Sequence, residues 1–352
     1  MTVLSALQLP FTDLVLIAGL IIVLLFAVRL FLRRQKSETD RDSVKPSRKM
    51  RNFIPYALRL IGFTVVSFII IGGSVLLYED YKVTEEDIAP APSQVEIPSD
   101  LTFRVEEITF TGGDDLKMAG WFVPPRNDAT IILLHGYGGN RTGMLWHAEK
   151  LIQAGYGVLM YDERASGESA GKNRSYGWQD APDIGGAIRY LASRAEVNPQ
   201  RIGIAGCSIG AQIALQGAAH YPGIQAVWAD GPSGILSSDY PPPHNWATGI
   251  AALSNYVLDW MYTVRLNTPT PAPMTAIIGK IAPRPIMMVA GGTPHPHFGA
   301  EAARVEYLAR HAGANAKVWI IPEAYHCDGP AQRPDEYATR MIGFFDAAFD
   351  AK

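Results

Sequence analysis

Hydrophobic and polar positions divide the chain into two parts with different patterns. Near the amino terminus, residues 14–32 and 60–78 are almost continuously apolar; Arg29 interrupts the first stretch, and the second carries no charge. Nineteen helical residues extend roughly 28 Å, close to the ~30 Å hydrocarbon core of a bilayer. We therefore predict two transmembrane helices, at about 14–32 and 57–78, within a membrane part formed by residues 1–83.

After residue 100, short apolar runs alternate with helix-length amphipathic segments. Residues 103–125 alternate and turn at Gly112-Gly113, as a β-hairpin does. This alternation predicts an α/β fold with a mostly parallel sheet that is covered on both faces. The apolar runs are "TIILLHG", "GVLMYDE", "RIGIAGC", "QAVWADG", "PIMMVAGG" and "AKVWIIP", and the helical segments between them include 142–154, 180–194, 209–220 and 299–312.

Two segments depart from this rhythm. Between the fourth and fifth runs, residues 233–280 contain no clear strand and are rich in aromatic side chains. We interpret them as a cap insertion that lines an apolar pocket with Trp246, Trp260, Met261 and Tyr262, the alternative being a surface excursion without function. Residues 84–100 are Pro-rich and acidic, which predicts a linker to a soluble domain at 101–352.

The charge distribution orients the membrane part. The net charge is −3, but residues 1–78 hold ten Lys and Arg against four Asp and Glu, or +6, so the remainder carries −9 and offers no basic surface for nucleic acid. The loop 33–51 holds eight basic residues against three acidic ones, and short basic loops stay cytoplasmic. A cleaved signal peptide fits poorly, because no Lys or Arg precedes the first apolar stretch. We therefore expect a multi-pass protein of the cell membrane with an extracytoplasmic soluble domain.

A serine stands between two glycines where the third run gives way to a helix. "GCSIG", from Gly206 to Gly210, matches G-x-S-x-G after a buried strand, which is the context of a nucleophile elbow. We interpret Ser208 as the candidate nucleophile. His326 follows the last apolar run in "IIPEAYHCDG" and is the candidate general base.

Two other loops follow earlier strands. The glycines of "LLHGYGGN" allow backbone N–H groups to face the serine, so Tyr137 and Ile209 are predicted to form an oxyanion hole. His135 is assigned a positioning role. In "YDERASGES", Asp162 and Arg164 are interpreted as a salt-bridged turn that braces the "HGYGG" loop.

The remaining candidates for special chemistry are few. Two cysteines form no disulfide framework, and we expect Cys207 and Cys327 to be free, buried thiols, although sequence leaves a bridge open. His295 and His297 have H-x-H spacing, but prolines flank both and Glu301 is the one carboxylate nearby. We predict no metal and no cofactor.

Residues 103–350 resemble the α/β-hydrolase superfamily, most closely its bacterial branch with HGYGG, a YDxRxxGxS-like segment, GxSxG and a final GxxH. The resemblance implies an eight-stranded sheet, a Ser-His-acid triad and hydrolysis of ester, thioester or amide bonds through an acyl-enzyme. Some members carry amino-terminal membrane helices.

The chain departs from this family at the acid. The family usually places an Asp two or three residues beyond the Gly that ends "PIMMVAGG", and the segment "TPHPHFGAEAARVEYL" has none. Glu301 is the first carboxylate after that strand and is our preferred acid. Asp230, at the end of the preceding strand, stays as the alternative.

These features predict a membrane-anchored serine hydrolase that cleaves an apolar acyl ester or thioester and has the lipid bilayer as a partner. Two alternatives stay open: a serine peptidase of the same fold, and a non-catalytic, membrane-bound binding module. The missing family Asp is the one feature that favours the binding module. The pattern predicts neither the substrate nor the oligomeric state.

Overall fold

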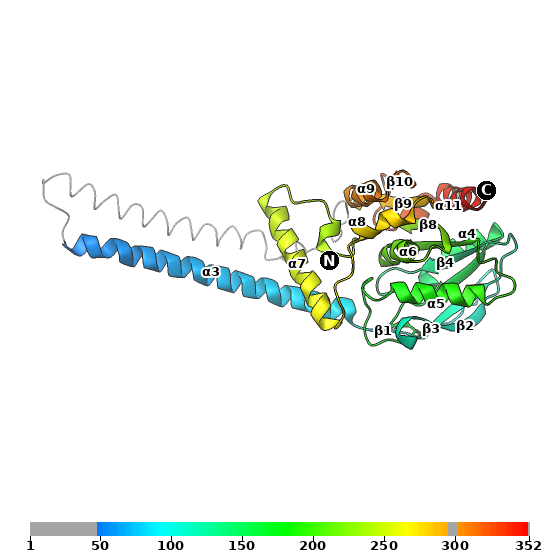
Figure 1. Cartoon of the computed structure of the whole chain (residues 1–352), viewed down its shortest axis with the longest axis horizontal. Coiled ribbons are helices and arrows are strands. Elements are labelled where there is room, and N and C mark those ends of the chain that lie inside the picture. Colours follow the sequence, from blue (N-terminus) through cyan, green and yellow to red (C-terminus); the bar gives the residue numbers. More distant parts are fainter. Residues whose placement is uncertain (1–47, 295–300, 351–352) are drawn as a thin grey trace. The chain divides into compact units, whose positions relative to one another are not determined.

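The computed structural model describes residues 48–294 and 301–350, and its contacts divide the chain into two units, Met1–Lys82 and Val83–Lys352. Figure 1 labels many of the elements, including α3, α7 and most strands of the sheet. The division lies within a residue of the end that we predict for the membrane part.

Helix α3 (Arg48–Ile88) begins in the first unit and ends in the second. Its segment Gly62–Ile88 is the one helix among the described residues that is long and apolar enough to cross a membrane. Apolar side chains such as Phe63 (71%) and Ile69 (67%) are exposed, whereas Val83 and Ile88 near its end are buried. The predicted span at 14–32 lies outside the described residues. The predicted loop 33–51 is wrong at its end, because residues 48–51 already belong to α3.

An eight-stranded sheet forms the centre of the second unit, in the order β10-β9-β8-β7-β4-β5-β3-β2. The predicted hairpin is an antiparallel edge pair joined by the short helix η1 (Gly113–Asp115), and β3 pairs antiparallel with β5. All other neighbours are parallel, so the predicted α/β fold with a mostly parallel, eight-stranded sheet is confirmed for this unit. The strands are β2 (Glu106–Thr111), β3 (Lys117–Val123), β4 (Thr130–Leu134), β5 (Gly157–Tyr161), β7 (Ile202–Cys207), β8 (Ile224–Asp230), β9 (Ile286–Gly291) and β10 (Ala316–Ile321).

Helices pack on both faces of the sheet because successive strand residues point to opposite faces. In β4, Ile132 and Leu134 join one apolar core, whereas Ile131 and Leu133 join the other. The first core contains α5 (Ala181–Ala192), α6 (Ile209–His220) and α9 (Glu301–Ala312), and the second contains α4 (Leu145–Gln153) and α11 (Pro334–Asp350). Two short elements, η2 (Arg141–Met144) and α10 (Gly329–Gln332), precede α4 and α11.

The regular elements of the predicted cap insertion are all helices, joined by irregular segments. They are η3 (Ser237–Asp239), α7 (Trp246–Arg265), α8 (Met274–Ile277) and η4 (Ile278–Ile281). The buried carboxylate of Asp239 closes the excursion, because it accepts the N–H groups of Ile235 and Leu236 before α7 and that of Met274 after it. One side chain thus fixes both ends of the cap.

The segment 84–100 is not the free linker that its composition predicts. Helix α3 continues to Ile88, and β1 (Ala91–Pro92) then pairs with β6 (Ser166–Gly167) in a two-stranded sheet. The N–H of Ala91 donates to Ala165 at 2.8 Å, and the Arg174 guanidinium donates to the carbonyl of Ala89. Backbone groups between the prolines therefore bind the loop after β5, and the segment packs on the domain.

Candidate active site

Ser208 occupies a sharp turn between β7 and α6. Its backbone lies in a left-handed region (φ 59°, ψ −118°) that non-glycine residues adopt only when their surroundings impose it. Its N–H donates to the carbonyl of Asp230 at 2.8 Å. A Cβ on Gly206 would lie 2.4 Å from the backbone of Gly210, and one on Gly210 would lie 2.5 Å from the carbonyl oxygen of His135. Both glycines are therefore required by close backbone packing.

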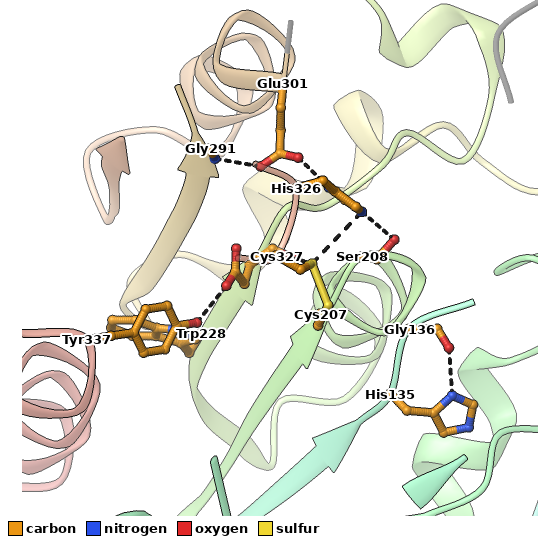
Figure 2. The surroundings of a disulfide bond; sticks show 11 residues. His135, Gly136, Cys207, Ser208, Trp228, Gly291, Glu301, His326, Cys327 and Tyr337 are labelled. Carbon is orange, nitrogen blue, oxygen red and sulfur yellow. Dashed lines mark hydrogen bonds and ion pairs between the residues drawn. A yellow bond between two sulfur atoms is a disulfide. The ribbon is translucent and has the colours of Figure 1, made fainter. Parts of the chain in front are cut away.

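His326 connects Ser208 to a buried carboxylate (Figure 2). Its Nε2 lies 2.8 Å from Ser208 Oγ, and its Nδ1 is hydrogen-bonded to Glu301 Oε2. The other oxygen of Glu301 accepts the N–H of Gly291 at 2.9 Å. An ionised carboxylate only accepts, so Nδ1 carries the imidazole proton and Nε2 is left to accept a proton from the serine hydroxyl.

Asp230, the alternative acid, has a different set of partners. Its Oδ2 accepts the hydroxyl of Tyr337 at 2.8 Å, and that hydroxyl also accepts the indole N–H of Trp228. Asp230 lies two residues after Trp228 on β8, so both side chains point to the face covered by α11. Burial raises the pKa of Asp230 to about 7. The structure thus brings Glu301, not Asp230, to the imidazole.

Tyr137 and Ile209, the predicted oxyanion pair, line one small cavity of about 10 Å³, close to the smallest that holds a water molecule. Beneath this loop, His135 is buried, and its two ring nitrogens are within hydrogen-bond distance of the Gly136 carbonyl and the Glu163 N–H. Burial lowers the pKa of His135, which favours the neutral ring. His135 therefore fixes the backbone of this loop.

The turn after β5 contains two separate braces. Asp162 accepts the N–H groups of Arg141 and Glu168 at 2.7 and 2.8 Å, so it ties the end of the "HGYGG" loop to the turn. Arg164 instead donates to both oxygens of Asp183 on α5, at 2.8 and 3.0 Å. The predicted bracing role thus fits Asp162, whereas Arg164 holds the turn against a helix.

The two cysteines form a disulfide, so the expectation of free thiols is wrong (Figure 2). Cys207 directly precedes Ser208, and Cys327 directly follows His326. Their Cα atoms are 6.1 Å apart, a normal separation for a bridged pair. A sequence separation of 120 residues carries no signal for this pairing, because it arises only when the two loops meet over the sheet.

Aromatic side chains connect this region to the cap. The ring of Tyr176 lies 5.5 Å from that of Tyr137 and stacks on Tyr262 of α7 at 5.9 Å. Of the predicted pocket residues, Met261 and Tyr262 are buried, but Trp260 is 60% exposed and does not line an interior pocket.

Sequence reasoning missed Arg174. Its guanidinium lies 4.2 Å from the centre of the Tyr137 ring and donates to the carbonyl of Glu86 at 2.8 Å; the Tyr137 hydroxyl donates to the same carbonyl. The end of α3 therefore contacts the loop that carries one predicted oxyanion donor. A single arginine in the polar segment "GKNRSYGW" has no motif around it that could have indicated this role.

His295 and His297, at which we predict no metal site, lie outside the described residues. Within residues 48–294 and 301–350, no group of three or more His, Cys, Asp and Glu side chains is arranged to hold a metal ion.

Comparison with known proteins places this chain in a family. The family model described as X-Pro dipeptidyl-peptidase (S15 family) matches residues 113–313. The chain is 30% identical over 260 residues to the protein YfhR of Salmonella typhimurium, an alignment that covers 71% of this chain and 84% of YfhR. The YfhR of Escherichia coli K12 is 28% identical over 257 residues, covering 70% and 83% of the two chains.

Solved structures agree on the fold. The esterase Pf2001 of Pyrococcus furiosus matches with a TM-score of 0.57 and 25% identity, over 74% of this chain and 97% of the esterase. The hypothetical protein PA2218 of Pseudomonas aeruginosa also has a TM-score of 0.57, with 19% identity over 73% and 99% of the chains. These matches confirm the predicted α/β-hydrolase fold. The chain belongs to the X-Pro dipeptidyl-peptidase (S15) family, within the α/β-hydrolase superfamily.

Proposed function

We propose that this α/β hydrolase is a membrane-anchored serine hydrolase that cleaves acyl ester or thioester bonds. The observation that best supports the proposal is the hydrogen-bonded series from Glu301 through His326 to Ser208. A nucleophile, a base in contact with it and a buried group that orients the base are the three elements that nucleophilic acyl transfer needs.

In the proposed reaction, Ser208 Oγ attacks the acyl carbonyl carbon while His326 Nε2 accepts the hydroxyl proton. The negative charge that develops on the carbonyl oxygen is stabilised by the N–H groups of Tyr137 and Ile209; one such donor is typically worth about 3 kcal/mol in the barrier. Glu301 stabilises the imidazolium and keeps its tautomer.

Collapse of this intermediate breaks the bond to the leaving group. The imidazolium of His326 gives its proton to the departing alkoxide or thiolate, and the acyl group stays on Ser208. Water then attacks the acyl-enzyme, with the same imidazole as base, and release of the carboxylic acid regenerates the serine hydroxyl. The sequence of steps needs no cofactor.

A peptidase activity is the second candidate, favoured by the family match over residues 113–313. Cleavage next to a peptide amino terminus would require a group that binds an ammonium ion. Glu163 and Asp180 line the cavity beside Tyr137 and Ile209, but this cavity of about 10 Å³ has room for roughly one water molecule and not for a peptide amino terminus. The acyl ester reading needs no such ammonium site and is therefore preferred.

One experiment separates these candidates. The full chain in detergent micelles is treated with a fluorophosphonate probe and assayed with p-nitrophenyl esters of increasing chain length and with an X-Pro-p-nitroanilide. We expect labelling at Ser208 and turnover of the esters. Turnover of the anilide alone would support the peptidase. No labelling by the probe and no turnover of either substrate would support the binding module.

The membrane anchor belongs to this proposal as well. Helix α3 supports it through the apolar segment Gly62–Ile88, whose side chains from Phe63 to Tyr78 include most of the exposed large apolar groups of the helix. The basic loop 33–51 supports a cytoplasmic position for the opposite end. We propose that the hydrolase unit lies on the extracytoplasmic side. The Cys207–Cys327 disulfide is consistent with that side, because disulfides persist in oxidising compartments.

The exposed residues of the cap helix α7 favour a substrate with an apolar acyl group. Five large side chains of α7 are 45–60% exposed and none is charged, although a helix facing water normally presents polar residues there. We propose that this face contacts lipid or the acyl chain of the substrate. Its residues are Ile250, Leu253, Tyr256, Trp260 and Val264.

A further inference from the structure

The disulfide joins the two loops that carry the proposed nucleophile and base. Cys207 precedes Ser208 at the end of β7, and Cys327 follows His326 in the loop after β10. Strands β8 and β9 lie between these two strands, which are thus about 14 Å apart at about 4.8 Å per strand. The loop after β10 must bend back over two strand ends to reach Ser208, and the disulfide fixes it there.

The sulfur atoms form part of the wall of the site. Sγ of Cys327 lies 3.9 Å from His326 Nε2, the nitrogen that faces Ser208, and 3.5 Å from the carbonyl oxygen of Asp230. Space around them is limited. A Cβ on Gly231 would lie 2.7 Å from the His326 ring and 3.3 Å from Cys327 Sγ. A change in the position of the Cys327 sulfur therefore acts directly on the imidazole.

Reduction would change this packing, because two thiols need more room than a disulfide. Bonded sulfur atoms are about 2.05 Å apart, whereas two separate ones must lie roughly 3.5 Å apart or more. Cys327 also has a left-handed backbone (φ 55°), which a non-glycine residue keeps only where its surroundings impose it. Its release would move the adjacent His326, and a displacement of about 1 Å in a catalytic group can cost roughly 100-fold in rate.

We propose that the Cys207–Cys327 disulfide is a redox-sensitive positioning element, which holds His326 Nε2 against Ser208 Oγ when oxidised and lowers turnover when reduced by a dithiol. This inference rests on the proposed function. A thiolate of the dithiol attacks one sulfur and releases the other cysteine as a thiolate; the second thiol of the reductant then displaces the first cysteine. Two protein thiols and one cyclic disulfide result. Both cysteines are partly exposed, so a small dithiol has access.

The kinetic test uses the full chain in detergent micelles with a short p-nitrophenyl ester. Dithiothreitol should lower kcat roughly 10- to 100-fold and leave KM within about twofold, because alignment and not substrate binding is lost. Reoxidation should restore kcat. The double variant Cys207→Ala/Cys327→Ala is the matched control: it should resemble the reduced wild type and not respond to dithiothreitol.

Two results would overturn the inference in this assay. One is an unchanged kcat when thiol titration confirms two free thiols. The other is a loss of activity that coincides with unfolding by circular dichroism, since the disulfide would then stabilise the fold without positioning the base.

A second readout does not depend on turnover. The imidazole of His326 is followed by NMR in ¹⁵N-histidine-labelled chain and assigned by its absence in His326→Gln. We expect its ring ¹⁵N chemical shifts to differ between the oxidised and reduced chains, because its hydrogen bonds to Glu301 and Ser208 change. Identical chemical shifts would refute the inference. An inactive chain with redox-dependent chemical shifts would remove the proposed function and keep the positioning role.

Discussion

At the scale of single residues, the nucleophile is the first assignment to test. Ser208→Ala removes the hydroxyl that lies 2.8 Å from His326 Nε2 and leaves the backbone turn in place, so we expect kcat for p-nitrophenyl esters to fall by several powers of ten with the fold intact. Steady-state kinetics and circular dichroism measure both effects. Ser193→Ala serves as the control and should keep wild-type turnover, because Ser193 is exposed and its hydroxyl donates to the Tyr190 carbonyl at the end of its own helix. Near-native turnover in Ser208→Ala would exclude the serine mechanism.

The acid can be tested by comparing two carboxylates. Glu301→Gln keeps the size of the side chain but removes the charge that orients and stabilises the imidazole, a loss worth roughly 10⁴-fold in one well-studied protease. We expect it to lower kcat far more than Asp230→Asn, whose side chain bonds Tyr337. The kcat of each purified variant, measured with a p-nitrophenyl ester, shows which carboxylate is the acid. An equal or larger effect of Asp230→Asn would assign the acid to the earlier strand.

Asp230 also predicts a pH dependence of stability. Burial raises its pKa to about 7, against 3.8 for an exposed Asp. Between these values the native state binds more protons than the unfolded state, so stability falls as pH rises through this window and is constant above about 8. Over the whole window, the free energy of unfolding falls by roughly 4 kcal/mol. The Tm of Asp230→Asn minus that of the wild type should therefore increase as the pH is raised from 5 to 8, as measured by thermal unfolding. A pH-independent difference would show that Asp230 is ionised throughout.

At the scale of elements, the alternation of side chains along β8 explains why two similar carboxylates have different partners. Trp228 and Asp230 point to the α11 side of the sheet, whereas Glu301 begins the helix that follows the neighbouring strand β9 and turns its carboxylate to the imidazole. Position at a strand end is therefore not enough to define an acid; the face on which the side chain projects also decides.

Helix α7 permits a prediction of its own. Its exposed side is apolar, so substitution there should weaken contact with long acyl chains or lipid and leave the catalytic series unchanged. We expect Leu253→Ser/Trp260→Ser to raise KM several-fold for esters of long-chain acids. Each Å² of apolar area that is no longer buried in the contact costs about 25 cal/mol of binding free energy. Short esters should be hydrolysed as by the wild type. Asn255→Ser on the same helix is the control, and equal effects on short and long esters would argue against this role.

At the scale of the whole molecule, the membrane topology has a direct test. The basic loop 33–51 predicts a cytoplasmic position, so protease added to intact cells that express the full chain should cleave within 84–352 and leave this loop protected. Immunoblots against each region measure the two outcomes, and permeabilised cells show that the loop is cleavable when reached. Protection of the hydrolase unit in intact cells would show the reverse orientation.

The sequence by itself determined the parts of this protein that depend on local pattern. Continuous apolar runs between amphipathic segments predicted the strands and the helices that cover them, because a strand buried on both faces must be apolar at every position. The elbow around Ser208 was predictable because G-x-S-x-G stands where a buried strand gives way to a helix. Gly206 packs against the nearby Gly210, whereas the contact of Gly210 with the His135 carbonyl joins distant segments. The place of His326 after the last strand followed from the order of the elements.

The tertiary structure decided what depends on contact between distant segments. The disulfide between Cys207 and Cys327 forms because the fold brings the loop after β10 to the end of β7. The spacing of the two cysteines along the chain does not predict this pairing. Arg174 and the end of α3 meet at Tyr137 for a similar reason, and so the segment predicted as a linker packs on the domain. Local pattern fixes which face of an element is apolar; which partner lies against that face is set by the geometry of the assembled sheet.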